Sequence, residues 1–180
     1  MRLDRTVALV GMMGAGKTSV GRRLAARLGV AFTDADQEIE AAAGLTVAEI
    51  FARHGEPEFR AGERRVIARL LGEAPHVLAT GGGAYMDATT RAAMREKAFT
   101  IWLRAPVELL LARIGKRQTR PLLNNADPRG TLERLLAERE PVYAEADYVL
   151  ECVEGPHGAA VEQVMAELKA RGLVQQEATT

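Results

Sequence analysis

Residues 11–18 read GMMGAGKT, and this segment limits the possible folds more than any other feature of the chain. It fills all four fixed positions of the phosphate-binding pattern GxxxxGK[ST]. A continuous apolar run at residues 6–10 precedes it, and an amphipathic stretch at residues 17–28 follows it. The glycines of such a loop let backbone N–H groups surround a phosphate at the positive end of a helix dipole. The alternative interpretation is a plain glycine turn between a strand and a helix.

The last two residues of this segment would carry its chemistry. Lys17 is expected to reach the β and γ phosphates of a nucleotide, and Thr18 is expected to ligate Mg²⁺. Both lie where the amphipathic stretch begins. The segment therefore predicts a nucleoside triphosphate site that holds a magnesium ion.

The rest of the chain alternates short apolar runs with amphipathic stretches. Strands are predicted at residues 6–10, 30–33, 76–80, 99–103 and 148–152. Helices are predicted at residues 17–28, 46–55, 57–72, 106–115, 131–145 and 158–171, and residues 175–180 are typical of a frayed tail. This alternation indicates an α/β fold in which a five-stranded parallel sheet has helices on both faces. Because the 180 residues contain no repeat or linker, we expect a single domain.

Ligands of such folds bind at the carboxyl ends of the strands, so the residues after each apolar run are candidates for a site. Asp34 and Asp36 follow the second predicted strand. Residues two apart in extended chain point the same way, so both carboxylates could face one site. One could hold a water of a Mg²⁺ ion while the other polarises an attacking hydroxyl. The alternative is that aspartate caps the following helix.

Three consecutive glycines, residues 81–83, end the third predicted strand. A glycine run loses much conformational entropy on folding, so we expect the backbone here to approach another group closely. The alternative is a flexible loop. Arg60 lies on a predicted helix beside Glu58 and Glu63, and by itself it is either a solvated charge or a functional group.

The alternation stops at residues 115–130, a long polar segment that contains two prolines and the pair Asn124-Asn125. Long loops in compact domains are commonly functional lids or disordered segments. A mobile arginine that closes over ATP would neutralise charge at the γ-phosphate and exclude water. The alternative is a polar surface loop whose charges confer solubility. The candidate arginines in or beside the segment are Arg113, Arg117, Arg120 and Arg139.

Composition argues against several classes of function. Lys plus Arg and Asp plus Glu each number 24, so no basic excess favours nucleic acid as a partner. No apolar run approaches the length of a membrane helix, and the N-terminus lacks the apolar core of a signal peptide, so we expect a cytoplasmic protein without a membrane partner. The lone Cys152 is expected in the core. The histidines show no metal-ligand spacing and are expected at the surface or at helix ends: His54, His76 and His157.

In order along the chain, seven blocks resemble the shikimate kinase family. They are GMMGAGKT (11–18), FTDAD with IE (32–36 and 39–40), IF (50–51), GEPEFRAGE (55–63), GGG (81–83), RPLL (120–123) and REPVY (139–143). The similarity extends from about Val7 to Leu168. Many NTPases share the first block, and the later blocks make the resemblance specific.

The resemblance implies a P-loop, nucleoside-monophosphate-kinase-like fold with a mobile lid. The whole chain, residues 1–180, would form one kinase domain, with the lid at about residues 115–130 and a substrate-binding subregion at about residues 34–62. It implies transfer of the γ-phosphoryl group of ATP to the 3-hydroxyl of shikimate, which gives shikimate 3-phosphate and ADP on the route to chorismate and aromatic amino acids. ATP and Mg²⁺ are the implied cofactors, and a monomer is expected.

The resemblance also implies a role for particular residues. ATP would be bound by Gly14, Ala15, Gly16, Lys17, Thr18, Ser19, Arg113 near adenine, and Arg120. Mg²⁺ would be held by Thr18 and, through water, by Asp34. Shikimate would be bound by Asp36, Arg60, Gly82 and Arg139. The catalytic groups would be Lys17, Asp36 as the candidate base, and Arg120 as the lid arginine. Residues 154–157 match the family least well, and no contact is assigned to them.

Two alternative functions remain: one is a kinase with another substrate, and the other is not an enzyme. The first is another small-molecule kinase of this fold, acting on gluconate or a nucleoside monophosphate. The combination of Arg60, the triple glycine and the RPLL block disfavours it. The second is a non-catalytic nucleotide switch, which could retain Lys17 but would not need two aspartates and a lid arginine.

Overall fold

A computed structural model describes residues 1–115 and 127–175. Five strands form the central sheet in the order β3-β4-β2-β5-β6, and every neighbouring pair is parallel. The strands are β2 (Thr6–Val10), β3 (Phe32–Asp34), β4 (Val77–Ala79), β5 (Ala98–Arg104) and β6 (Tyr148–Glu151). In the register of the middle strands, Leu9 lies between Ala79 of β4 and Ile101 of β5. The predicted α/β class and five-stranded parallel sheet are confirmed.

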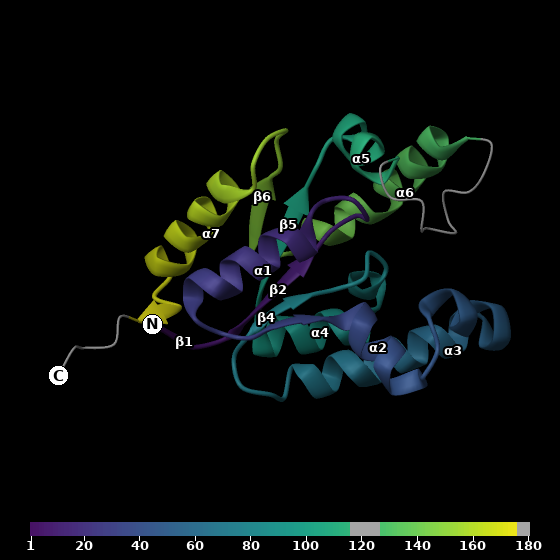
Figure 1. The fold of residues 1–180 in the computed structure, drawn as a ribbon, viewed down its shortest axis with the longest axis horizontal. Helices are drawn as coiled ribbons and strands as arrows, with labels where there is room; N and C mark the ends of the chain where they lie inside the picture. The colour runs from purple at the N-terminus through teal and green to yellow at the C-terminus, as the bar shows by residue number, and fades with distance from the viewer. Residues whose placement is uncertain (116–126, 176–180) are drawn as a thin grey trace.

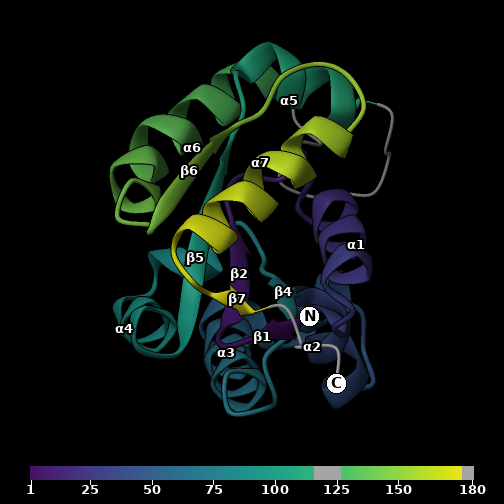
Figure 2. The same cartoon turned by 90° about the vertical axis from the view of Figure 1, so that its left-hand side faces the viewer.

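Helices cover both faces of this sheet (Figures 1 and 2). They are α1 (Lys17–Leu28), α2 (Ala35–Ala43), α3 (Val47–Leu70), α4 (Ala88–Lys97), α5 (Val107–Ile114), α6 (Pro128–Tyr143) and α7 (Gly158–Ala170), with a 3-10 turn η1 (Ala84–Met86). Helices α1 and α7 pack side by side on one face, while α4 contacts β5 and α3 on the other. In Figure 1, α3 and the pair α5 and α6 extend past the same end of the sheet. No helix in the described ranges is long and apolar enough to cross a membrane.

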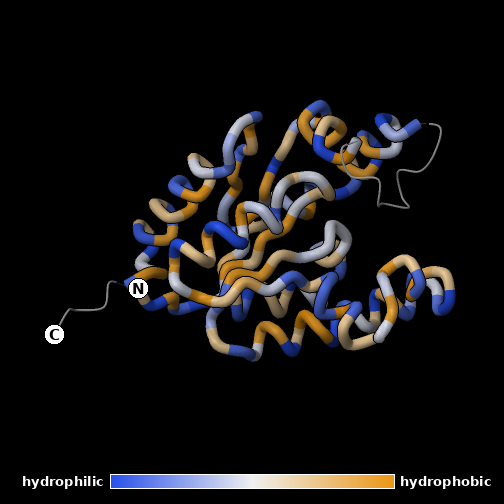
Figure 3. Tube along the Cα trace, viewed as in Figure 1, coloured by the Kyte–Doolittle hydropathy of each residue, from blue (hydrophilic) through white to orange (hydrophobic). Residues whose placement is uncertain are grey.

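The core lies along the central strand. All five residues of β2 are buried, as are the three residues of β4. A parallel strand covered on both faces has no solvent side, so its sequence is a continuous apolar run rather than an alternating one. Figure 3 shows this concentration of hydrophobic residues in the middle of the molecule.

The two ends of the chain pair with each other. Strand β1 (Arg2–Leu3) runs antiparallel to β7 (Val174–Gln175), with Leu3 buried opposite Val174. The prediction of a frayed tail from residue 175 is therefore wrong at Gln175, whose side chain donates to Asp4 at 3.0 Å. Residues 176–180 lie outside the described residues.

Several predicted boundaries differ from the structure. The second strand begins at Phe32 rather than residue 30, because the Val30 N–H bonds back to Ala25 at the end of α1, at 3.1 Å. The helix predicted from residue 131 begins at Pro128, where Asp127 accepts a hydrogen bond from the Gly130 N–H. The two helices predicted at 46–55 and 57–72 are both present within α3, where Gly55, with a non-helical φ of 78° and ψ of 172°, separates them.

Helix α4 and the burial of His76 were not predicted. In α4 only Thr90 and Met94 are buried, so the helix lacks the repeated apolar positions that periodicity detects. Its start is marked instead by Asp87, which caps the Thr90 N–H at 2.9 Å. The prediction that His76 lies at the surface is wrong: it precedes β4 with 3% exposure, and its Nδ1 is 2.9 Å from the Ala74 carbonyl.

Candidate active site

The carboxyl ends of β2, β3 and β4 meet around a cavity of about 260 Å³. Its lining joins the phosphate loop, the two aspartates and the triple glycine with part of α5 and the start of α7. The lining residues are Gly14, Gly16, Lys17, Thr18, Ser19, Asp34, Asp36, Ala79, Thr80, Gly81, Gly82, Arg113, Ile114 and His157. Segments distant in sequence thus form one site at the edge of the sheet where ligands were expected.

The phosphate loop has a backbone that its glycines make possible. Gly11, Gly14 and Gly16 have φ values of 134°, 80° and 98°, a region that side chains with a Cβ rarely enter. The Lys17 ammonium donates to two carbonyls of the loop, at 2.7 Å to Gly11 and 2.8 Å to Met12. The lysine therefore lies folded over the loop at the start of α1, where a phosphate would offer it stronger, charged acceptors.

Thr18 and Asp34 are in direct contact. The Thr18 hydroxyl donates to Asp34 Oδ2 at 3.0 Å, while Asp34 Oδ1 accepts from the Asp36 N–H at 3.1 Å and caps α2. The helix-cap interpretation of Asp34 is therefore confirmed, and the other oxygen of the same carboxylate contacts Thr18 of the phosphate loop. A hydroxyl and a carboxylate are the hard oxygen donors that suit Mg²⁺, which keeps most of its waters. The described ranges hold no cluster of three or more His, Cys, Asp or Glu side chains suited to a metal.

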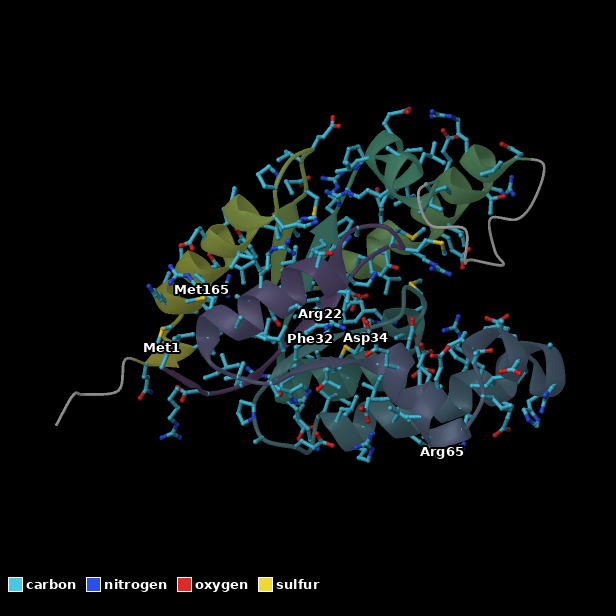
Figure 4. The ribbon with its side chains drawn as sticks, viewed as in Figure 1. Met1, Arg22, Phe32, Asp34, Arg65 and Met165 are labelled. Atoms are coloured by element: carbon cyan, nitrogen blue, oxygen red, sulfur yellow. The ribbon has the colours of Figure 1, made fainter. Side chains whose placement is uncertain are left out.

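Close packing between β3 and α1 determines this contact. A Cβ on Gly21 of α1 would lie 2.5 Å from the ring of Phe32, so only glycine lets the strand come this near. The Arg22 guanidinium lies 5.2 Å from the centre of the same ring. Figure 4 shows Arg22, Phe32 and Asp34 grouped beside α1. Phe32 thereby holds the end of β3, and with it Asp34, against the helix that begins with the phosphate loop lysine.

Two acidic side chains converge on Gly81. A Cβ on that glycine would lie 2.9 Å from Asp36 Oδ1 and 3.2 Å from Glu63 Oε1. Glu63, on α3, is only 2% exposed. Burial raises the pKa of the Glu63 carboxyl, the hydrogen bond from Arg60 opposes this, and the charge of Asp36 raises it further. The sequence analysis assigned no role to Glu63, although it lies within the GEPEFRAGE block.

Arg60 reaches the site from the same helix. Its Nη1 donates to Glu63 Oε2 at 2.7 Å, and its Nη2 lies 3.4 Å from Glu56. A Cβ on Gly83 would lie 2.6 Å from Arg60 Nη1. The side chain is 25% exposed, so Arg60 is a partly buried charge against the glycine backbone rather than a fully solvated one.

Arg139 approaches the glycines from α6. It is 9% exposed, and within the described part of the chain it forms no ion pair with a carboxylate. A Cβ on Gly82 would lie 3.2 Å from Arg139 Nη1, and the same nitrogen lies 3.9 Å from Met12 Sδ. The close backbone approach expected at residues 81–83 is therefore an approach to charged groups: two acids at Gly81, and one arginine each at Gly82 and Gly83.

Arg113 and His157 line the opposite end of the cavity. Arg113 Nη1 donates to the Ala15 carbonyl at 3.0 Å and lies 3.4 Å from that of Gly14, so it holds the outer side of the phosphate loop. His157 stands beside Gly16, where a Cβ would be 3.2 Å from its ring. Burial lowers the pKa of His157, and the charges of Arg113 and Arg23 lower it further.

Several residues discussed from the sequence lie outside the described residues, away from the cavity, or in an unexpected place. Arg117, Arg120 and most of the predicted lid fall at residues 116–126, outside the described residues. Cys152 is buried as expected, and burial raises the pKa of its thiol to about 11. His157 was predicted as a surface or helix-end residue without function. It does precede α7, but it also lines the cavity, and only the topology brings residues 152–158 to Gly16.

The chain is similar to known proteins of one family. A family model described as shikimate kinase matches residues 13–169. The chain is 56% identical over 166 residues to the shikimate kinase of Bradyrhizobium diazoefficiens, covering 92% of this chain and 80% of that one. It is 56% identical over 165 residues to the shikimate kinase of Caulobacter vibrioides, covering 92% and 82%. The structure of shikimate kinase from Acinetobacter baumannii in complex with shikimate superposes with a TM-score of 0.89 at 39% identity, covering 93% and 94%.

Proposed function

The chain belongs to the shikimate kinase family, and from this premise we propose that its cavity transfers the γ-phosphoryl group of ATP to the 3-hydroxyl of shikimate. The products are shikimate 3-phosphate and ADP. Lys17 and the phosphate loop bind the donor at one end of the cavity, and Asp36, Arg60, Gly82 and Arg139 bind the acceptor at the other.

One observation carries the acceptor assignment: Arg139 is buried and, among the described residues, has no carboxylate partner. A buried guanidinium without a counter-ion is costly, so a ligand that supplies a carboxylate gains the energy of that pairing. Arg60 lies one glycine further along the same backbone, and its Nη2 contact with Glu56, at 3.4 Å, is longer than its Nη1 bond to Glu63, at 2.7 Å. Two planar guanidinium groups form the fork that a carboxylate matches.

Asp36 serves the hydroxyl side of the acceptor. Its carboxylate lies beside Gly81, between the arginines and the phosphate loop. A hydroxyl seated there donates to Asp36 and faces the γ-phosphoryl group, with Asp36 accepting the proton as transfer proceeds. Glu63 lies next to Asp36 and accepts from Arg60, so its role is to hold the arginine, while Asp36 is the proposed base.

At the donor end, Lys17 exchanges its two carbonyl acceptors for phosphate oxygens. Arg113 and His157 border the outer part of the cavity, where the rest of the nucleotide lies. Arg120 lies outside the described residues; its proposed role is to neutralise charge on the phosphates. The subregion at about residues 34–62 carries the acceptor-binding residues Asp36 and Arg60.

Thr18 and, through water, Asp34 hold the Mg²⁺ ion that neutralises charge on the β and γ phosphates. Their 3.0 Å hydrogen bond supports this, because both oxygens already face one point beside the phosphate loop. The Thr18 hydroxyl would ligate the ion directly and Asp34 would hold one of its waters, while Asp34 Oδ1 accepts from the Asp36 N–H.

The enzyme acts as a monomeric cytoplasmic protein with no nucleic acid or membrane partner. Among the described residues, the only large hydrophobic side chains with high exposure are Met1 and Val153, too few for an apolar interface patch. The balanced charge gives no attraction to nucleic acid. A single buried cysteine suits a reducing compartment.

Calorimetric titration with shikimate tests the carboxylate fork. Arg139→Lys and Arg60→Lys each keep the charge but lose one hydrogen bond to the carboxylate, so the dissociation constant should rise by about ten- to a hundredfold. Arg27→Lys is the matched control, because Arg27 pairs with Glu162 on the surface. Unchanged shikimate affinity in both site variants would remove the fork from the acceptor site.

A further inference from the structure

Tyr143 follows Arg139 by one helical turn on α6, so the two side chains share a face of the helix. The tyrosine is fully buried, with its ring 5.8 Å from that of Trp102 and 6.5 Å from that of Tyr85. Within this apolar setting its hydroxyl donates to the Gly82 carbonyl. Arg139 Nη1 lies beside the same glycine, 3.2 Å from where a Cβ on Gly82 would stand.

The hydrogen bond to the Gly82 carbonyl fixes the orientation of the whole peptide unit between Gly82 and Gly83. A peptide unit is planar and trans, so its C=O and the next N–H point in opposite directions. When Tyr143 holds the Gly82 carbonyl, it also fixes the direction of the Gly83 N–H. Glycines have no side chain that would restrict this plane by other means. The hydroxyl therefore orients the backbone between the positions that face Arg139 and Arg60.

The same tyrosine connects the acceptor end of the cavity to the phosphate loop. Met12 Sδ lies 3.8 Å from the Tyr143 hydroxyl and 3.9 Å from Arg139 Nη1. The carbonyl of Met12 accepts from Lys17 at 2.8 Å. A single loop residue thus contacts the donor-binding lysine on one side and the Arg139–Tyr143 pair on the other.

We propose that Tyr143 is a positioning residue for the acceptor: by holding the Gly82 carbonyl beside Arg139, it keeps both groups in the geometry that receives the shikimate carboxylate. The inference deepens the proposed function and rests on it. Tyr143 touches neither substrate nor nucleotide and acts only through Arg139 and Gly82.

The test is Tyr143→Phe, which removes the hydroxyl and keeps the ring. The Gly82 carbonyl beside Arg139 loses a buried partner, so the KM and the dissociation constant for shikimate should rise about tenfold, while the KM for ATP stays unchanged. The matched control is Tyr85→Phe. Tyr85 is equally buried and stacks on Tyr143, but its hydroxyl is hydrogen-bonded to Thr100 on β5, away from the cavity.

A second variant guards against a failure of Tyr143→Phe to fold. Replacing Tyr143 with 4-aminophenylalanine keeps the ring and an N–H donor for Gly82, and shikimate affinity should stay within about threefold of wild type. If the wild type binds shikimate but Tyr143→Phe and Tyr85→Phe have the same KM for shikimate, the positioning role alone is overturned. An equal rise in the KM values for ATP and shikimate also overturns it. A wild type that fails to bind shikimate overturns the proposed function and this inference together.

Discussion

Glu63 is the residue whose burial and charge oppose each other most clearly. Its carboxyl is 2% exposed, and it accepts from Arg60 at 2.7 Å. Burial raises its pKa above the ordinary 4.5 even though the arginine opposes the shift. An ionised Glu63 therefore lowers the stability of the fold while it holds Arg60 for the acceptor. Sites that bind charged ligands commonly trade stability for geometry in this way.

Replacing Glu63 with Gln should show how much the ionised carboxyl lowers the stability of the fold. A carboxyl with a raised folded pKa favours the folded state at low pH, and this contribution is lost as the pH rises through that pKa. Glu63→Gln does not titrate, so its free energy of unfolding relative to wild type should increase as the pH rises from below 4.5 to neutrality. Urea unfolding across this pH range measures the difference. A relative stability that instead falls with rising pH would mean that the Arg60 bond outweighs burial.

A substitution at Gly83 tests the geometry of the site with little effect on the backbone. Alanine there would place a Cβ 2.6 Å from Arg60 Nη1, and the flexible arginine rather than the backbone would move. Gly83→Ala should therefore raise the KM for shikimate about tenfold, by displacing one guanidinium of the fork. Gly62→Ala on α3 is the control, since its nearest neighbour, Arg65 Nη2, would be 3.9 Å away. Equal shikimate KM values for the two variants would contradict the proposed position of Arg60.

At the scale of residues, the sequence identified candidate residues more successfully than it predicted the contacts that those residues make. Lys17 and Thr18 begin a helix directly after a glycine-rich loop, as predicted, because a short pattern fixes a local backbone. Glu63 and Tyr143 belong to recognised blocks, but their contacts with Arg60 and Gly82 depend on how α3 and α6 pack. That packing is a tertiary property, and no local pattern encodes it.

At the scale of elements, α3 carries both Arg60 and Glu63, and its first turn is stabilised by a side-chain cap. That cap is a capping box: the Glu49 N–H donates to Thr46 Oγ1 at 3.2 Å, and the Thr46 N–H donates to Glu49 Oε2 at 2.8 Å. The box lies before the kink at Gly55, while the two charged residues lie after it.

Thr46→Ala should therefore affect stability without affecting catalysis. Loss of an N-cap of this kind costs about 1 kcal/mol. Because the Gly55 kink separates the cap from the charged residues, kcat and the KM for shikimate should match the wild type. Thermal unfolding and steady-state kinetics on the same preparation check both halves. A large rise in the shikimate KM would show that the first part of α3 also determines where Arg60 lies.

Elements with strong patterns were predicted well and those with weak patterns were missed. Strand β2 is a continuous apolar run and was predicted at its observed bounds. Helix α4 buries only Thr90 and Met94, and the pairing of β1 with β7 joins two short segments from opposite ends of the chain. Neither has enough local apolar periodicity to stand out, because long-range contacts stabilise them.

For the whole molecule, the sheet order explains how a neutral chain builds a strongly charged site. Strand β2 lies between β4 and β5, so the phosphate loop emerges beside the glycines that follow β4, and β3 brings Asp34 to the same edge. Lys17, Arg60, Arg113 and Arg139 face Asp34, Asp36 and Glu63 there, although the net charge of the chain is zero. The prediction of a parallel sheet was enough to place these segments at one edge. The order of the strands within the sheet could not be deduced from the periodicity of the sequence.

The central claim is that the pocket takes shikimate as its acceptor, and ADP release in the presence of ATP and Mg²⁺ tests it most directly. Shikimate, quinate, gluconate, AMP, CMP and no acceptor are compared. A rigid ring positions its carboxylate and hydroxyls together, whereas open-chain gluconate loses rotational freedom on binding. Shikimate should exceed every other acceptor by at least about a hundredfold in kcat/KM. Preference for gluconate or a nucleotide, or ADP release independent of any acceptor, would contradict the account.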